Sequence, residues 1–501
     1  MRTKLSFLIL IIIIVSSCIK DFSTTISFGK LEFSKDTVYL DTIFTNIGSA
    51  TYNLKVYNTS NNDITIPKIA LEKGTSSNYR LNVDGISGKD FDNIDILAKD
   101  SIYIFVETTI DITTTLNPLY TDKILFDNGT NQQDVDLVTL VKDANFIYPG
   151  KDLITMKIDS LTLDGEPTTI KGRFLTDSEL TFTNQKPYVI YGYAAVPANK
   201  TLTINAGAKI HFHKNSGLII DNNATLKASG SLTEKIIFQG DRLEHSFSNV
   251  PGQWETIWFR AGSKENVIQH TQIKNGIIGV LVDSIGTNTS PTLTLKNTEI
   301  YNNSNYGILG RETNILGENL VVGNAGLASL AATIGGTYNF THCTFANYWN
   351  NSLRQSPTVL VNNNFAYTNQ NGQKVIETRD LHAANFTNCI IEGNNNIEFI
   401  LDKADGSLFN YSISNCLIKF NDLNENFTDI NELKFDDITH YQNIILNGNP
   451  HFKNTNLHNF SIGQNSSGIN KATTTSISLD ILGINRTANP DLGAYQHITF
   501  D

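Results

Sequence analysis

The sequence predicts an all-β protein in which an N-terminal β-sandwich is followed by a solenoid of stacked parallel strands. Two observations predict this fold class. Residues 27–145 alternate apolar and polar side chains with a period of two, as half-buried strands do. Beyond residue 186, short apolar strands recur every ~20–27 residues and are separated by Asn and Gly, which is typical of a repeat that stacks on itself.

The composition of the 501-residue chain agrees with this class and excludes several others. Charged residues make up 17% of the chain, below the roughly 25% of an average soluble protein. Asn occupies about 59 positions, whereas Pro (11) and Met (2) are scarce. Such a composition excludes a coiled coil, a polytopic membrane protein and a disordered chain. The net charge of −11 argues against a nucleic-acid partner, which requires a basic face.

Residues 1–17 predict a lipoprotein signal peptide. Arg2 and Lys4 form a positive start, and the apolar run that follows, Leu5–Val15, is shorter than the ~20 residues of a membrane-spanning helix. Val15-Ser16-Ser17-Cys18 resembles the lipobox of bacterial lipoproteins. The resemblance implies that Cys18 is lipidated and that residues 18–26 tether the chain to the membrane. The alternative is an ordinary signal peptide with an incidental cysteine.

The residues beside Cys18 bear on the location of the anchored chain. Lys20-Asp21 resembles the export tag of some bacterial surface lipoproteins. This resemblance implies an outer-membrane protein that displays its domains at the cell surface. A plain polar tether is the alternative, and a location that faces the periplasm stays open.

The alternating segment, residues 27–145, predicts an immunoglobulin-like β-sandwich. Turn-forming residues such as Asp84-Gly85 separate its strands. The order of its elements resembles the immunoglobulin-like modules of bacterial surface proteins. The first histidine of the chain is His211, so we interpret this part as a spacer or presentation module without catalytic residues. Three sets of apolar residues each share a strand face: Tyr52, Leu54 and Val56; Ile102, Ile104 and Val106; Val135, Leu137 and Val141.

Residues 146–185 are interpreted as a polar connector, after which an internal repeat follows. In this repeat a polar residue precedes a branched or aromatic apolar residue by three positions. Asn at such bends tolerates a left-handed backbone and stacks into ladders, so the repeat predicts Asn ladders at the bends and inward-facing apolar side chains. The pairs are His270–Ile273, Asn297–Ile300, Glu318–Val321, His342–Phe345, Asn362–Phe365, Asn388–Ile391 and Asn415–Ile418.

Three cysteines, Cys343, Cys389 and Cys416, directly follow the polar position of a repeat. Their matching offsets predict one internal ladder of buried thiols. One cysteine per repeat lacks the close ligand spacing of a zinc site, and an odd number is a poor disulfide framework. His211 and His213 lie two apart on an expected strand, but no third ligand is evident. No metal and no cofactor are therefore expected.

Two segments resemble parts of right-handed parallel β-helices from bacterial extracellular proteins. Tyr188–Ile210 resembles their entry turns, and Ser467–Tyr495, which ends in Asp491-Leu492-Gly493-Ala494-Tyr495, resembles their closing segment. The resemblance covers residues 186–501 and implies the pectin-lyase-like β-helix fold with a C-terminal cap. Its members include polysaccharide lyases, polygalacturonases, adhesins and non-catalytic surface proteins. We interpret Arg486 and Asp491 as an ion pair that seals the last turn.

The catalytic patterns of that fold are missing from this sequence. Glycoside hydrolysis needs two carboxylates across the scissile bond, but neither Glu299 nor Asp436-Asp437 is accompanied by the Gly-His-Asp and Arg-x-Lys motifs of polygalacturonases. A lyase needs a base and a cation that neutralises the uronate, and no Asp cluster has the spacing of a Ca²⁺ loop. The available basic residues are Arg242, Arg260, Lys264, Arg311, Arg354 and Arg379.

Tryptophans supply the candidate glycan-binding residues. If Ile257 and Phe259 face the core, Trp254 and Trp258 share the outer face about 13 Å apart, at ~3.3 Å per residue, and stack on successive sugar rings. Packing of one tryptophan beneath the charged insertion at residues 239–252, or against the N-terminal domain, is the alternative, and we favour it. The candidate binding set is Arg242, Trp254, Trp258, Arg260 and Trp349.

The sequence thus favours a membrane-anchored, non-catalytic envelope lipoprotein whose β-helix binds a glycan or another surface polymer. One alternative is a polysaccharide lyase or glycoside hydrolase that acts on an extracellular polysaccharide. A second alternative is a structural envelope protein that binds a protein partner.

Overall fold

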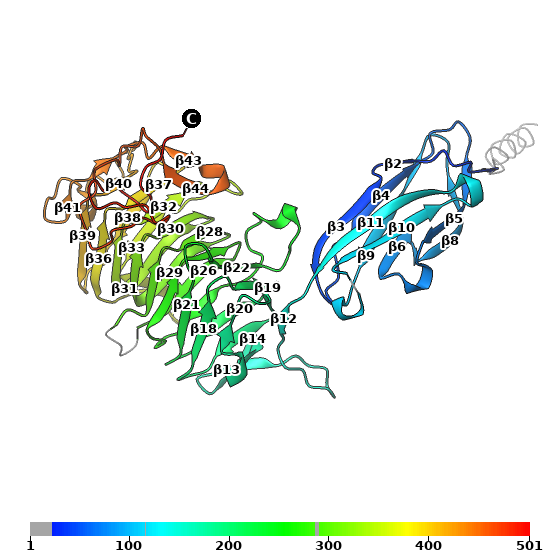
Figure 1. The fold of residues 1–501 in the computed structure, drawn as a ribbon. Coiled ribbons are helices and arrows are strands. Elements are labelled where there is room, and N and C mark those ends of the chain that lie inside the picture. Colours follow the sequence, from blue (N-terminus) through cyan, green and yellow to red (C-terminus); the bar gives the residue numbers. More distant parts are fainter. Residues whose placement is uncertain (1–22, 116, 286–289, 501) are drawn as a thin grey trace, which may run out of the picture. The chain divides into compact units, whose positions relative to one another are not determined.

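The computed structural model describes residues 23–115, 117–285 and 290–500, so the expected signal peptide and lipidation site, Cys18, lie outside the described residues. The described residues form strands and short 3-10 helices and contain no α-helix, which confirms the all-β class. The chain divides into two compact units, Met1–Asp143 (unit 1) and Ala144–Asp501 (unit 2) (Figure 1).

Unit 1 contains two sheets that share one core. Leu54 and Val56 from one sheet and Val135 and Leu137 from the other are fully buried, so the alternation predicted from the sequence is confirmed. One sheet has the order β1 (Thr25–Ile26), β5 (Ile64–Leu71), β10 (Leu119–Phe126), β11 (Gln133–Lys142) and β3 (Thr37–Phe44), with β8 (Asp90–Ile96) paired to β5. The other has the order β2 (Glu32–Phe33), β4 (Tyr52–Tyr57), β9 (Ser101–Thr108), β6 (Tyr79–Val83) and β7 (Ile86–Gly88).

Unit 2 is built on two long sheets, of 11 and 18 strands within the described residues. Each strand of the first circuits pairs in parallel with the strand three places later in the chain. We call each set of three consecutive strands a circuit, so that each strand of one circuit is the parallel partner of the corresponding strand of the next. The series are β16 (Tyr188–Ile190), β19 (Lys209–Phe212), β22 (Ile236–Gly240) and β25 (Thr271–Lys274); β17 (Tyr193–Val196), β20 (Gly217–Ile220) and β23 (Ile257–Phe259); and β18 (Thr201–Asn205), β21 (Thr225–Ser229) and β24 (Asn266–Gln269).

Later circuits continue this stack, which Figure 1 shows as a run of arrows passing from green through yellow to orange. Two antiparallel pairs lie apart from the two long sheets: β34 (Asn364–Thr368) with β35 (Lys374–Thr378), and β43 (Phe452–Asn454) with β44 (Asn459–Ile462). The stacked strands are β26 (Ile278–Val282), β27 (Leu293–Lys296), β28 (Glu299–Asn303), β29 (Tyr306–Glu318), β30 (Val321–Ala325), β31 (Ala328–Thr341), β32 (Thr344–Asn347), β33 (Val359–Asn362), β36 (Leu381–Thr387), β37 (Ile390–Gly393), β38 (Phe399–Asp402), β39 (Phe409–Ser414), β40 (Leu417–Ile418), β41 (Tyr441–Gln442) and β42 (Ile445–Leu446).

The segment predicted as a connector, residues 146–185, is instead part of unit 2. β12 (Asn145–Ile147), β14 (Glu166–Phe174) and β15 (Thr181–Phe182) pair in parallel with β16, β17 and β18. β13 (Ser160–Leu163) forms an antiparallel hairpin with β14. β12, β13 and β15 are only two to four residues long and carry too few alternating positions for a sequence pattern, and pairing with the next circuit stabilises β12 and β15.

The internal repeat is confirmed, with two corrections. Ile273, Ile300, Phe345, Ile391 and Ile418 lie in one series of parallel partners. Val322, and not Val321, fills the place between Ile300 and Phe345; both residues are apolar, so the pattern did not distinguish them. Phe365 is outside the stack, because it is 51% exposed on the β34–β35 hairpin, which lengthens one circuit.

The bends of the repeat carry the predicted ladder. Five of the seven predicted polar positions have left-handed backbones, with φ between 45° and 57°: His270, Asn297, His342, Asn388 and Asn415. At the bend assigned to Glu318 the left-handed residue is Asn319 (φ 49°), and Asn362 is instead the last residue of strand β33. Asn319 donates to the Asn297 side chain at 2.9 Å, and Asn388 Nδ2 lies 3.0 Å from His342 Nε2. Side-chain hydrogen bonds between circuits thus offset the cost of the left-handed conformation.

The cysteine ladder is also confirmed. Cys343, Cys389 and Cys416 are free thiols that are fully buried. The Cys389 backbone N–H donates to Cys416 Sγ at 3.4 Å. Burial raises the pKa of the Cys389 and Cys416 thiols, so they stay protonated and act as small apolar side chains.

The prediction that Arg486 forms an ion pair with Asp491 is wrong, because each of the two residues has other partners. Arg486 is 2% exposed, donates to the carbonyls of Gly493 (3.1 Å) and Ala494 (3.0 Å), and contacts His342. Asp491 pairs with His497 at 2.7 Å. The closing segment therefore binds the ladder through Arg486, an interaction that sequence spacing within the segment does not reveal.

Candidate functional site

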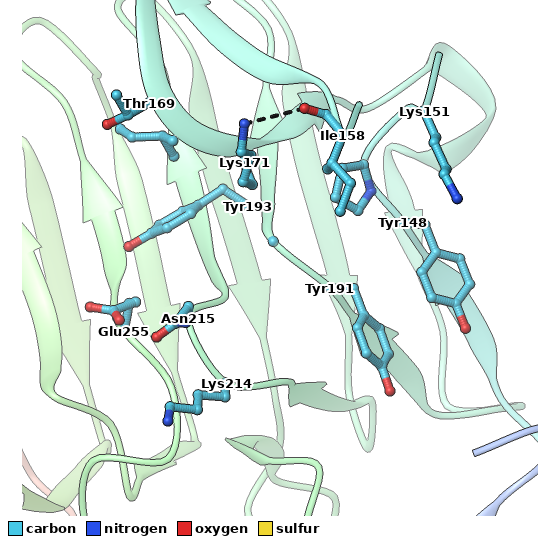
Figure 2. Close-up of a pocket in the computed structure, with 13 residues that line it drawn as sticks. Tyr148, Lys151, Ile158, Thr169, Lys171, Tyr191, Tyr193, Lys214, Asn215 and Glu255 are labelled. Carbon is cyan, nitrogen blue, oxygen red and sulfur yellow. Dashed lines mark hydrogen bonds between the residues drawn. The ribbon is translucent and has the colours of Figure 1, made fainter. Parts of the chain in front are cut away.

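A pocket of about 640 Å³ lies beside the first circuits of unit 2, and we call it the tyrosine pocket (Figure 2). Its lining contains three tyrosines, three lysines and one carboxylate. The volume is in the range of small-molecule sites. The lining residues are Tyr148, Pro149, Lys151, Ile158, Thr169, Ile170, Lys171, Tyr191, Gly192, Tyr193, Lys214, Asn215 and Glu255.

Two glycines shape the tyrosine pocket. Gly192, between Tyr191 and Tyr193, has φ of 67°, and a Cβ there would lie 2.7 Å from the Lys171 carbonyl oxygen. A Cβ on Gly217 would lie 2.6 Å from Tyr193 Cε1. Glycine at 217 thus allows the Tyr193 ring to lie against β20, and glycine at 192 allows the sharp bend that turns the two tyrosines into the pocket.

The aromatic side of the pocket is a group of neighbouring rings. The Tyr148 and Tyr191 centroids lie 5.0 Å apart, and Tyr191 stacks on His213 at 4.3 Å. Tyr148 is 47% exposed, so its ring is accessible to a ligand. Burial raises the pKa of Tyr191 and Tyr193, so both hydroxyls remain hydrogen-bond donors at neutral pH.

The polar side of the pocket contains ammonium groups and one carboxyl. Lys171 Nζ donates to the Ile158 carbonyl (3.2 Å) and to Ser160 Oγ (2.9 Å). Lys151 and Lys214 are exposed. Partial burial raises the pKa of Glu255, which Figure 2 shows beside Asn215 on the same side of the pocket as Tyr193.

The expectation that Trp254 and Trp258 share an exposed face is wrong. Trp254 is 1% exposed, its ring stacks on Phe212 at 4.4 Å, and its Nε1 donates to the Lys274 carbonyl. Trp258 is partly buried against the β13–β14 hairpin and donates to Asp283 at 2.7 Å. The alternation fails because β23 begins only at Ile257, so Trp254 does not follow the alternation of that strand.

The other predicted binding residues have structural partners. Trp349 is 6% exposed and donates to Ser352. Arg242 pairs with Glu244 at 2.7 Å. Arg260 pairs with Asp164, in the β13–β14 turn, and with Asp221. Arg260 and Trp258 therefore hold the hairpin whose strand β14 lines the tyrosine pocket, and the five predicted residues do not themselves form one site.

The remaining arginines and histidines considered in the sequence analysis have structural partners. Arg311 pairs with Asp283, Arg354 with Glu398, and Arg379 with Glu377. His211 is buried against the Gly240 carbonyl, whereas His213 is exposed and pairs with Asp241. Across residues 23–115, 117–285 and 290–500, no three His, Cys, Asp or Glu side chains gather as metal ligands.

The sequence interpretation did not identify the tyrosine pocket. Tyr191-Gly192-Tyr193 was the available signal, because two tyrosines that flank a glycine at a bend place two rings on one side of the chain. Tyr148, Lys214 and Glu255 gave no signal, since they come from three other segments.

No family model and no curated protein matches this chain. Solved structures give low scores. A family 123 glycoside hydrolase from Clostridium perfringens has 11% identity and a TM-score of 0.15, over 22% of this chain and 25% of the hydrolase, so the chain spans about a quarter of that protein. The PapD-like domain 7 of human CEP192 has 12% identity and a TM-score of 0.17, over 26% and 97%. The catalytic unit of an α-1,3-glucanase from Streptomyces thermodiastaticus has 10% identity and a TM-score of 0.20, over 73% and 79%.

A search of the described part of the chain for membrane-crossing helices found none with the required length and apolar character.

Proposed function

We propose that this chain is a cell-envelope lipoprotein, anchored through Cys18 in the outer membrane at the cell surface, that binds a glycan without cleaving it. In this proposal unit 1 is an immunoglobulin-like spacer, and unit 2 is a right-handed, pectin-lyase-like parallel β-helix that binds the glycan in the tyrosine pocket. The lipobox-like Val15-Ser16-Ser17-Cys18 supports the anchor.

The pairing of strands in unit 2 supports the β-helix. Each of β16, β17 and β18 is paired with the strand three places later, as expected when successive turns of a solenoid stack. Crossovers between parallel strands are right-handed in nearly all proteins, which favours the right-handed form.

The tyrosine pocket is the single observation that carries the binding function. Tyr148 is 47% exposed beside the Tyr191 ring, and aromatic rings pack against the apolar faces of sugar rings. Tyr193, Asn215 and Glu255 add hydroxyl, amide and carboxyl groups that match sugar hydroxyls. An aromatic surface bordered by such groups matches a saccharide, which has both apolar ring faces and hydroxyl groups.

A polysaccharide-cleaving enzyme is the second candidate, and Glu255 favours it. Partial burial raises the pKa of this carboxyl, as in a general acid. Hydrolysis needs a second carboxylate opposite the first. Among the described residues that line the pocket, Glu255 is the single carboxylate. The arrangement therefore favours binding over cleavage.

The test uses the chain without its first 18 residues, which retains all residues that the structure describes, in native gels cast with neutral and acidic polysaccharides. Retarded migration with the polymer intact supports the proposal. Cleared polymer in the stained gel favours the enzyme. Unchanged migration in every gel contradicts glycan binding and favours a protein partner.

A further inference from the structure

We propose that the ligand of the tyrosine pocket is an anionic saccharide, whose carboxylate or sulfate groups bind to Lys151, Lys171 and Lys214. The inference rests on the proposed function, because it assumes that the pocket binds a saccharide. It adds the chemical class of that saccharide.

The three lysines reach the pocket from three separate segments. Lys151 follows β12, Lys171 lies on β14, and Lys214 follows β19. Within the described residues, none of the three ammonium groups has a carboxylate in ion-pair contact; Lys171 donates only to a carbonyl and a hydroxyl. Other lysines of unit 2 pair with acids, among them Lys200 with Asp177 and Lys235 with Glu299.

The charge of the pocket is opposite to that of the chain. Its lining has three ammonium groups and one carboxyl, so the net charge of the lining is 3 − 1 = +2, in a protein whose net charge is −11. Asp241 is outside the lining and pairs with His213. The carboxylate of Asp159 lies against Gly150, which is between the lining residues Pro149 and Lys151, but Asp159 does not itself line the pocket. A local cationic site on an acidic protein attracts anions selectively, because the surrounding surface repels them elsewhere.

We expect a neutral saccharide to bind in the pocket more weakly than an anionic one. Covering the lysines with uncharged sugar removes water from the ammonium groups and returns only neutral hydrogen bonds. An anionic group returns charge-assisted hydrogen bonds, which are about twice as strong. The tyrosine rings serve both classes of sugar, whereas the lysines distinguish between them.

Native affinity gels of the chain without its first 18 residues test this inference. The polymers are polygalacturonate for carboxylate groups, dextran sulfate for sulfate groups, and dextran as the neutral polymer. We expect retardation by polygalacturonate or dextran sulfate, and the better polymer identifies the anionic group. The K151Q/K214Q variant should weaken this binding at least about fivefold.

The matched control is Lys209→Gln, which removes an exposed lysine on β19 that does not line the pocket. It should bind as the unaltered chain does. Equal loss in K209Q and in K151Q/K214Q would overturn the inference, because the attraction would then arise from general charge. Retardation by dextran alone would also overturn it and leave the proposed function intact. Retardation by none of the polymers would overturn both.

Discussion

The rings of Tyr148 and Tyr191 lie 5.0 Å apart with an angle of 33° between their planes, although the whole β13–β14 hairpin separates them in the chain. The contact forms because β12 and β16 are parallel partners in one sheet, and the two tyrosines follow directly after these strands. The register of two short strands thus creates the aromatic side of the tyrosine pocket.

The first prediction removes the more exposed of these rings. Tyr148→Ala should weaken saccharide binding by about 1–2 kcal/mol, because the sugar loses one face of its aromatic contact. Affinity gels over a range of polymer concentrations give the change in dissociation constant. Tyr367→Ala removes a 39% exposed tyrosine outside the pocket and serves as the control. Equal effects of the two variants would contradict the assignment of the site.

The second prediction concerns pH and Glu255. Partial burial raises the pKa of Glu255, so this carboxyl becomes neutral as the pH falls through the raised value. Its negative charge opposes an anionic ligand above that value. Binding to dextran sulfate, whose sulfates stay ionised, should therefore strengthen as the pH falls and weaken as it rises.

Glu255→Gln is permanently neutral and should bind nearly equally at every pH, whereas the unaltered chain varies. Burial raises the pKa of the neighbouring Tyr193, so its hydroxyl stays protonated in this range. His213→Gln replaces the imidazole that stacks on Tyr191 and should leave the pH dependence in place. If the pH dependence survives in Glu255→Gln and disappears in His213→Gln, the titrating group is His213, and the prediction for Glu255 is wrong.

The third prediction concerns a buried ion pair that stabilises the fold and lies far from the pocket residues in the sequence. Arg354 and Glu398 form an ion pair whose side chains are 1% and 0% exposed, and Thr358 also donates to Glu398. Glu398→Gln leaves the arginine charge buried without its counter-charge and should lower the unfolding free energy by about 3–5 kcal/mol. Urea unfolding followed by circular dichroism measures the loss.

The control for Glu398→Gln is Glu377→Gln, because Glu377 forms an exposed pair with Arg379. Its removal should change the unfolding free energy by less than about 1 kcal/mol. An equally small effect of Glu398→Gln would mean that water reaches the Arg354 guanidinium.

The fourth prediction concerns acid stability and His342. Burial and the neighbouring Arg486 lower the pKa of His342 to about 3. The unfolded chain accepts this proton near pH 6.5, so the contribution of neutral His342 is complete above that pH and is lost as the pH falls toward 3. The loss between pH 7 and pH 5 is about 2 kcal/mol.

His342→Asn should make unfolding less sensitive to acid over this range, since Asn occupies the equivalent bends at Asn319 and Asn388. His382→Asn, at an exposed position on β36, should leave the sensitivity unchanged. Urea midpoints at pH 7 and pH 5 for the three proteins decide the point, and parallel losses in all three would exclude His342 as the cause.

Local patterns in the sequence predicted much of the core. Alternation identified the buried faces of β4, β9 and β11, and the repeat identified the stack from Ile273 to Ile418. The left-handed bends at Asn297 and Asn388 followed from residue type, because Asn adopts that backbone more readily than other non-glycine residues. These features depend on neighbours a few residues away or on a fixed period.

The tertiary structure decided what the period did not specify. Trp254 is in the core and not on the surface, because the chain leaves strand geometry before β23. The tyrosine pocket combines Tyr148, Lys171, Tyr191, Lys214 and Glu255, which lie on five segments. Only the parallel register of successive circuits brings these segments together. The sequence by itself therefore determined that circuits form and which side chains fill them, whereas contacts between circuits determined where a ligand can bind.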